Sequence, residues 1–450
     1  MRSRQVIQST TVLLGVVTLT WLLFRDDALR GSFHTTKVTL TEKLKSEKPP
    51  PQPKYKPTPT FTPPPIQDPF PSLATATPPP IPKYNVPKKG IWKEYGLEIA
   101  PPLVIGFTRS YPMLLQAVVS YITAGWPPEQ IYVIENTGMQ QANARGQLSL
   151  QHPFHLNHTS LKTLGVNVVQ TPVLLSFAQL QNFYLSLSYA HEWPYYFWSH
   201  MDVLALGHEN GFENLTPRGG DPGYKSLYTL CLEELKRTLD TDDRWATRFF
   251  AYDHLTLQNP KALEDIGGWD TLIPYYMTDC DTYTRFIMKK WSQLDSNCGV
   301  ITDTSVALDD LLALYRDVNV TPKFTDPNPP PPPPPPAEDE PTKGEIVARD
   351  GPGPGLTDPI EYWKSLLGTA DQMFHYKHAD RGRNTWQSGQ HGGQGEPFYY
   401  DNAGFTEALD VLTEAGKEVF RRKWGHGNCD LIGGGGLKFE DQWRVLKDFE

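Results

Sequence analysis

The architecture of the chain is indicated by residues 103–138. This stretch reads LVIGFTRSYPMLLQAVVSYITAGWPPEQIYVIENTG. Its apolar run at 103–107 predicts a buried strand, residues 114–124 carry a helical pattern, and residues 131–134 predict a second strand. A strand, a crossover helix and another strand make a βαβ unit, so we expect the two strands to lie parallel in one sheet.

The same alternation continues toward the C-terminus. Residues 166–169 predict a third strand, residues 175–191 a helix, and residues 195–198 the start of a fourth strand that runs into 199–204. The sequence therefore predicts an α/β fold with a mostly parallel sheet flanked by helices. In folds of this kind, ligands bind at the carboxyl ends of the strands.

The N-terminal segment predicts a membrane anchor. Residues 6–24 carry no charge, and Arg2 and Arg4 precede them. A helix of this length just spans a hydrocarbon core of about 30 Å, and the preceding charges favour a cytoplasmic N-terminus. We expect an uncleaved signal anchor. A cleaved signal peptide is the alternative, but no small-x-small cleavage site follows Phe24.

Proline accounts for 43 of the 450 residues, about twice the usual share, and is concentrated in two stretches. Residues 25–90 predict a disordered, extended stem, and residues 322–359 predict a disordered insertion. The predicted organisation is a cytoplasmic tail (1–5), a transmembrane anchor (6–24), the stem (25–90), an α/β core (91–321), the insertion (322–359) and the C-terminal part of the core domain (360–450).

Composition excludes several classes of protein. The net charge is −9, from 42 basic and 51 acidic residues, which argues against a nucleic-acid partner because non-specific binding needs a basic surface. A hydrophobic content of 39% excludes a wholly disordered chain. The four cysteines form no CxxC pair, so a cysteine zinc site is not expected. One or two disulfides, in a lumenal domain, or four buried thiols remain open.

Asp202 is the first candidate site residue. It stands just past the predicted fourth strand, within Ser199-His200-Met201-Asp202. A carboxylate at that edge of the sheet can hold Mg²⁺ or Mn²⁺ together with two diphosphate oxygens, because both ions favour oxygen ligands. The alternative is a strand-end aspartate that caps the next turn.

Asp279 and Asp281 form the second candidate site, at the start of a helix predicted at 282–291. Paired carboxylates suit general-base chemistry or the binding of substrate hydroxyls, whereas capping of the helix N-terminus accounts for one of the two. His426, between two glycines and close to Trp424, is a third candidate. A lone histidine is more often structural or exposed than a ligand.

Residues 101–310, with the C-terminal block, resemble glycosyltransferases of the GT-A fold, of the family 2-like kind found in fungi as type II Golgi proteins. The likeness rests on the order and spacing of four segments, 104–109, 133–138, 196–202 and 266–285. In the third segment, His200-Met201-Asp202 stands where the family has its DxD motif, so the first carboxylate is missing. In the fourth, Thr278 replaces the glutamate of Glu-Asp-x-Asp.

The resemblance implies a nucleotide-sugar donor, UDP- or GDP-linked. The family binds the nucleoside at the ends of the first two strands, which here end in Thr108 and Arg109 and in Glu135 and Asn136. Asp202 would meet the donor's diphosphate through a divalent cation.

The resemblance also implies the metal ligands and the base. Mn²⁺ or Mg²⁺ would be held by Asp202 with His426 and His200. Asp279, or less favourably Asp281, would take the proton from the acceptor hydroxyl in an inverting reaction.

The partners implied are a glycan, glycoprotein or glycolipid acceptor and a Golgi or ER membrane, with the catalytic domain in the lumen. Two other functions remain: a catalytically inactive, membrane-anchored scaffold of the same fold, and a glycoside hydrolase that pairs Asp279 or Asp281 with another carboxylate.

Overall fold

The computed structural model describes residues 52–57, 64–325, 357–379, 392–399 and 401–446. The chain divides into two compact units, 1–60 and 61–450, and all that follows concerns the second. The predicted tail, the anchor at 6–24 and most of the insertion lie outside the described residues. Among the helices of the described part, none is both long and apolar enough to cross a membrane.

A seven-stranded sheet runs through the domain in the order β3-β2-β1-β4-β7-β6-β8. Its strands are β1 (Leu103–Phe107), β2 (Ile131–Glu135), β3 (Asn167–Gln170), β4 (Tyr196–Ser199), β6 (Trp245–Phe250), β7 (Leu255–Gln258) and β8 (Ser292–Ser296). The first four pair in parallel. β7 runs antiparallel to both of its neighbours, while β6 and β8 are parallel. A separate antiparallel pair joins β5 (Val203–Leu206) to β9 (Val300–Asp303).

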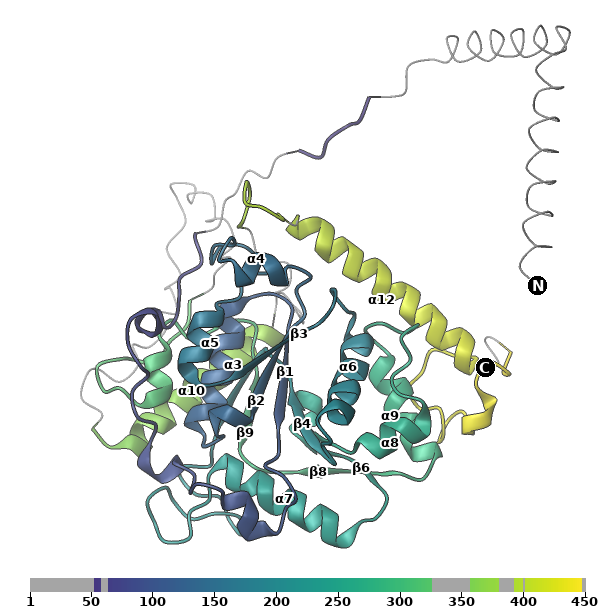
Figure 1. Ribbon diagram of the computed structural model, residues 1–450. Helices are drawn as coiled ribbons and strands as arrows, with labels where there is room; N and C mark the ends of the chain where they lie inside the picture. Colours follow the sequence, from purple (N-terminus) through teal and green to yellow (C-terminus); the bar gives the residue numbers. More distant parts are fainter. Residues whose placement is uncertain (1–51, 58–63, 326–356, 380–391, 400, 447–450) are drawn as a thin grey trace, which may run out of the picture. The chain divides into compact units, whose positions relative to one another are not determined.

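Helices cover both faces of the large sheet (Figure 1). The α-helices are α3 (Tyr111–Thr123), α4 (Gln140–Ala144), α5 (His158–Leu164), α6 (Phe177–Ala190), α7 (Leu227–Thr241), α8 (Pro260–Ile266), α9 (Thr278–Met288), α10 (Pro359–His378) and α12 (Asn402–Trp424). Short 3-10 helices lie at Pro71–Ala74, Lys83–Asn85, Ile91–Tyr95, Pro128–Gln130, Tyr252–His254, Leu311–Tyr315 and Phe439–Asp441.

The side chains of β1 alternate between two apolar layers, as a strand period of two requires. Leu103, Ile105 and Phe107 belong to the cluster that includes α3, α7 and α10. Val104 points the other way, into the cluster beneath α6. A strand buried on both faces reads as a continuous apolar run, which is why 103–107 could be recognised from the sequence.

The order in which strands are added to the sheet reverses between β1 and β4. From β1 it moves outward through β2 to β3, and then returns to place β4 on the other side of β1. The crossover helices α3 and α5 lie on one face and α6 on the opposite face (Figure 1). This winding confirms the predicted α/β fold with a mainly parallel central sheet. The crevice at such a reversal, outside the carboxyl ends of the strands, is where doubly wound folds bind ligands.

The predicted stem is partly wrong. Residues from 64 onward are described as part of the domain, and Phe70 and Leu73 lie in its largest apolar cluster. Asn85 is fully buried and donates hydrogen bonds to the Thr123 carbonyl at 2.8 Å and to Glu209 Oε1 at 2.9 Å. Proline limits the backbone but does not prevent burial, so the scattered apolar residues of this segment pack on the core.

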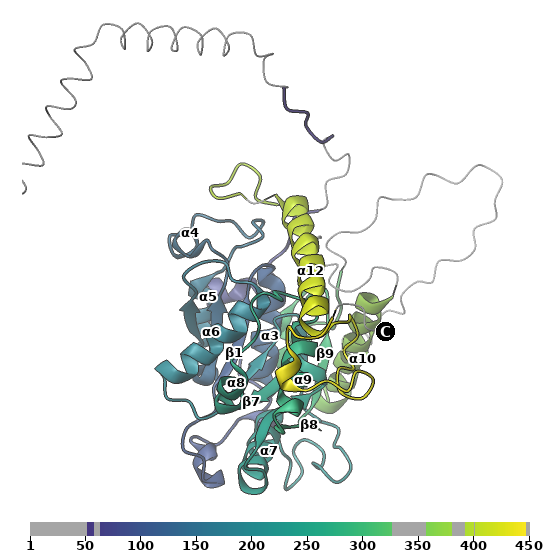
Figure 2. The same cartoon turned by 90° about the vertical axis from the view of Figure 1, so that its right-hand side faces the viewer.

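The cysteines form one disulfide, as the first of the two alternatives allows, so the alternative of four buried thiols is wrong. Cys280, in α9, forms a disulfide with Cys429 of the C-terminal segment. Cys231 and Cys298 are buried free thiols. The bridge ties the first turns of α9 to the segment that follows α12, and Figure 2 shows α12 running in front of the sheet toward α9.

Candidate active site

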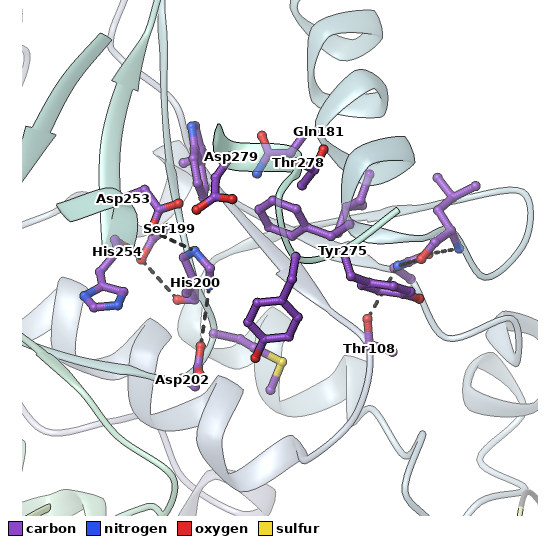
Figure 3. A pocket seen from close by; sticks show the side chains of 18 of the residues that line it. Thr108, Gln181, Ser199, His200, Asp202, Asp253, His254, Tyr275, Thr278 and Asp279 are labelled. Carbon is purple, nitrogen blue, oxygen red and sulfur yellow. Dashed lines mark hydrogen bonds and ion pairs between the residues drawn. The ribbon is translucent and has the colours of Figure 1, made fainter. Parts of the chain in front are cut away.

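A cavity of about 300 Å³ opens at the carboxyl ends of β1, β2 and β4. Thr108 and Arg109 line it from the end of β1, Asn136 from the end of β2, and His200 and Asp202 from the end of β4. Figure 3 shows several of these side chains around the cavity. The fold thus brings most of the residues predicted for the donor site into one hollow, at the position where the strand order reverses.

Asn136 holds the β2 end of the cavity together. Its Oδ1 accepts a hydrogen bond from the Leu175 amide at 2.7 Å, and its Nδ2 donates to the Leu175 carbonyl at 2.9 Å and to Thr108 Oγ1 at 3.4 Å. The side chain therefore fixes the 171–175 loop against β1. It shapes this wall of the cavity.

Glu135, predicted to contact the donor, does not line the cavity. Its carboxylate is fully buried and accepts hydrogen bonds from Asn143 at 2.8 Å and from Gln170 at 2.9 Å, and it pairs with His158 at 2.9 Å. Burial raises its pKa, but the three partners together hold the pKa below its usual value. A carboxylate with so many partners stabilises the β2 edge and is not available to a ligand.

Arg109 connects β1 to α12 across the mouth of the cavity. The residue is 2% exposed, its Nη2 donates to Asn402 Oδ1, and its guanidinium lies 4.4 Å from the ring centroid of Phe405. Phe405 itself lines the cavity. The N-terminal turn of α12 is therefore part of the site, which no local sequence pattern indicated.

His200 sits between two carboxylates at the end of β4. Its Nδ1 is 3.7 Å from Asp202 Oδ1 and its Nε2 is 3.6 Å from Asp253 Oδ1, as Figure 3 shows. Burial lowers the pKa of His200, but Asp253 and Asp202 outweigh it and raise the pKa overall. Two carboxylates therefore flank the imidazole at the floor of the cavity.

Lys377, from the last turn of α10, also reaches this floor and was not predicted. Its Nζ donates to Asp202 Oδ2 at 2.7 Å and to Asp303 Oδ1. Asp303 Oδ2 is 3.0 Å from His378 Nε2. Burial lowers the pKa of Lys377, but the two carboxylates raise it above its ordinary value, so the ammonium stays charged.

The residues present do not fit the divalent cation implied by the resemblance. Asp202 and Asp303 already share the ammonium of Lys377. Within the described residues, no group of three or more His, Cys, Asp or Glu side chains is placed to hold a metal ion. His426 lies beyond α12, where its Nδ1 accepts from the Asn428 amide at 3.2 Å, and it is not among the residues that line the cavity.

Asp279 lines the cavity from the first turn of α9. Tyr252, in the turn between β6 and β7, donates a hydrogen bond from its hydroxyl to Asp279 Oδ2 at 2.8 Å. The residue that caps the helix is Met277, and no side-chain hydrogen bond caps it, so the capping interpretation of Asp279 is wrong. The carboxylate is half-buried, held on one side and open to the cavity.

Asp281 points away from the cavity into the protein. Its Oδ2 accepts from Arg285 Nε at 2.8 Å, and its Oδ1 accepts from Trp424 Nε1 at 2.8 Å and lies 2.7 Å from Lys423 Nζ. The carboxylate is fully buried. Asp281 therefore anchors the end of α12 to α9, and the general-base role predicted as its alternative does not fit this position.

Two of the turns beside the cavity contain residues with positive φ. Ala251 and Tyr252 have φ of 60° and 54°, and Met277 has φ of 74°. L-residues adopt this region only when their surroundings impose it, and such residues concentrate at functional sites. The strained turns are those that present Tyr252 and Asp279 to each other.

The Asp202–Lys377 pair makes a testable contribution to stability. Burial raises the pKa of Asp202, but Lys377, with His200 and His254, lowers it to about 2 from an ordinary 3.8. Because the pKa is lower in the folded protein, the ionised carboxylate stabilises the folded state by roughly 2 kcal/mol above pH 4. This stabilisation is lost as the pH falls toward 2. Asp202→Asn is expected to remove this part of the pH dependence. Urea unfolding of the wild type and Asp202→Asn from pH 6 to pH 2 gives the free energy of unfolding at each pH. The same dependence of this free energy on pH in both proteins would refute the assignment.

Comparison with known proteins adds little. No family model matches the chain, and no curated protein matches it. A mannosyltransferase from Pyrobaculum calidifontis, solved in complex with GDP-Man and Mn²⁺, is 12% identical over 46% of this chain and 60% of its own, with a TM-score of 0.29. A cytidylyltransferase from Leptospira borgpetersenii serovar Hardjo-bovis is 11% identical over 46% and 82%, with a TM-score of 0.28. Scores this low establish neither a shared fold nor a shared activity.

Proposed function

We propose that the chain is a glycosyltransferase that moves a sugar from a nucleotide-diphosphate donor to a glycan or glycoconjugate acceptor. One observation supports this most directly. A single cavity at the reversal point of a doubly wound sheet combines the polar ends of β1, β2 and β4 with the carboxylate of Asp279. Nucleotide sites occupy this position in such sheets.

The donor would lie across the strand ends. Thr108 and Asn136 form the wall for the nucleoside, as the resemblance implies, with Glu135 acting only behind it. The diphosphate would face the floor, where Lys377 supplies positive charge among the carboxylates. Fixed charges of this kind stabilise the negative charge that develops on a leaving group.

Asp279 would be the general base. It removes the proton from an acceptor hydroxyl as that oxygen attacks the anomeric carbon. The new carbon–oxygen bond forms as the bond from the anomeric carbon to the diphosphate breaks, and the nucleoside diphosphate leaves with the electron pair. Attack from the side of Asp279 inverts the anomeric centre. The rings of Tyr252 and Tyr276, about half exposed beside Asp279, offer a surface for the acceptor sugar.

We place the domain in the lumen of the Golgi or ER, behind a single N-terminal anchor. The disulfide between Cys280 and Cys429 supports an oxidising compartment. The anchor itself remains a prediction from residues 6–24.

Calorimetric titration of the full-length protein with UDP and GDP, in EDTA and in Mn²⁺, tests the proposal. We expect one nucleotide to bind and Thr108→Glu to weaken binding at least tenfold, because a carboxylate in the cavity repels the diphosphate. Thr241→Glu, on the exposed end of α7, is the matched control. Absence of binding for both nucleotides under every condition would overturn the transferase and favour the scaffold.

A further inference from the structure

The floor of the cavity contains a buried, positively charged side chain, that of Lys377. The side chain of Lys377 is 2% exposed, and its ammonium lies between the carboxylates of Asp202 and Asp303. These carboxylates lie at the same end of the small sheet, because Asp202 precedes β5 and Asp303, which pairs with Val203, ends the antiparallel strand β9. Lys377 arrives from α10, a separate part of the chain. Three distant segments thus converge on one buried charge.

The position of Lys377 is fixed by packing as well as by charge. α10 buries Trp363, Leu366, Ala370 and Met373 at helical spacing, and Lys377 continues the same stripe. The ammonium is therefore directed inward by the helix that carries it. A lysine in this stripe needs partners, because an unpaired buried charge is strongly destabilising.

We propose that Lys377 takes the place of a divalent cation, so that the nucleoside diphosphate binds this site without a metal. This inference rests on the proposed function. An ammonium has three N–H donors, and two are directed at Asp202 and Asp303, which leaves one for a phosphate oxygen. Lys377 lines the cavity, so its ammonium would lie beside a ligand bound at the floor.

The same arrangement disfavours a metal ion at Asp202. A divalent cation bound to this carboxylate would stand beside the ammonium that shares it, and like charges at such a distance repel. Lys377 forms ion pairs with both Asp202 and Asp303, so a metal ion at either carboxylate would have to displace the ammonium. Asp202 is thereby a positioning residue for Lys377 and not a metal ligand.

Manganese binding is the first test, because it needs no activity. Free Mn²⁺ is measured by electron paramagnetic resonance in the presence of full-length wild type, Lys377→Ala and the control Lys364→Ala, an exposed lysine of the same helix. We expect the wild type and the control to leave the free signal unchanged. Mn²⁺ bound by the wild type, and released in Asp202→Ala, would overturn the inference.

Nucleotide binding is the second test. In EDTA, the wild type is expected to bind the nucleotide as well as in Mn²⁺, and Lys377→Ala to bind it at least tenfold more weakly. Lys377→Ala leaves two buried carboxylates without their ammonium, which could prevent folding. The double variant Lys377→Ala/Asp303→Asn removes one of these charges, and thermal unfolding checks that both variants fold. Equal affinity of either variant and the wild type in EDTA would overturn the proposal.

The outcomes separate the inference from the proposed function. Nucleotide binding that appears only with Mn²⁺ would leave the transferase standing and overturn the role of Lys377. No binding of UDP or GDP in either condition would overturn both.

Discussion

Asp279→Asn is expected to lower turnover by about 10²- to 10⁴-fold, the usual contribution of a general base, while nucleotide affinity stays within about twofold of the wild type. The amide keeps the shape of the side chain and can still accept the hydrogen bond from Tyr252, but it cannot take a proton. Turnover is measured as nucleoside diphosphate released from UDP- and GDP-sugars in the presence of saccharide acceptors.

The neighbouring carboxylate provides the contrast. Asp281→Asn removes a charge that pairs with Arg285 and Lys423 in the interior, so its main effect is expected on stability. Breaking a buried ion pair costs about 3–5 kcal/mol. The two variants separate catalysis from folding at positions two residues apart. Turnover within a fewfold of wild type in Asp279→Asn would contradict the assigned base.

Tyr252→Phe tests how Asp279 is held. Loss of the hydroxyl that donates to Oδ2 frees the carboxylate to rotate, and we expect turnover to fall less than in Asp279→Asn, with nucleotide binding unchanged. A positioning role predicts that kcat falls while nucleotide affinity and thermal stability stay unchanged, whereas a merely structural role lowers thermal stability as well.

The fold was largely predictable because its signals are local. Strands buried on both faces give apolar runs, as residues 103–107 and 131–134 do for β1 and β2, and the run at 166–169 falls on the edge strand β3. The crossover helices show their own period, and the order of elements selects a mainly parallel sheet. The antiparallel strand β7 and the small sheet of β5 and β9 were not predicted, because pairing between distant segments leaves no periodic trace.

The candidate site was predictable only in part. Thr108, Asn136 and Asp202 follow strands, so their place at the carboxyl edge could be derived from the order of elements. Glu135 also ends a strand, but its side chain turns away from the cavity into a buried network. Which way a strand-end carboxylate faces depends on partners elsewhere in the chain.

Lys377 was not predicted as a site residue, although the sequence carries a local signal for it. Lys377 lies in the last turn of α10, which ends at His378, and no candidate site residue was predicted in that part of the chain. Extending the stripe of Leu366, Ala370 and Met373 by one turn places a lysine where an apolar residue is due. A charged residue in phase with a buried stripe is a signal that sequence analysis can use, although its partner Asp303 emerges only from the fold.

Reduction of the Cys280–Cys429 disulfide is expected to lower the free energy of unfolding by roughly 3–5 kcal/mol, because the bridge closes a long loop in the unfolded chain. The two cysteines are 149 residues apart, and Cys280 lies between Asp279 and Asp281. Urea unfolding of the full-length protein with and without dithiothreitol measures the loss. Cys280→Ser/Cys429→Ser should match the reduced wild type and be insensitive to the reductant. Because the bridge also fixes the first turn of α9, turnover should fall when the disulfide is reduced. A reduced protein that keeps its full stability would show that packing alone holds this turn.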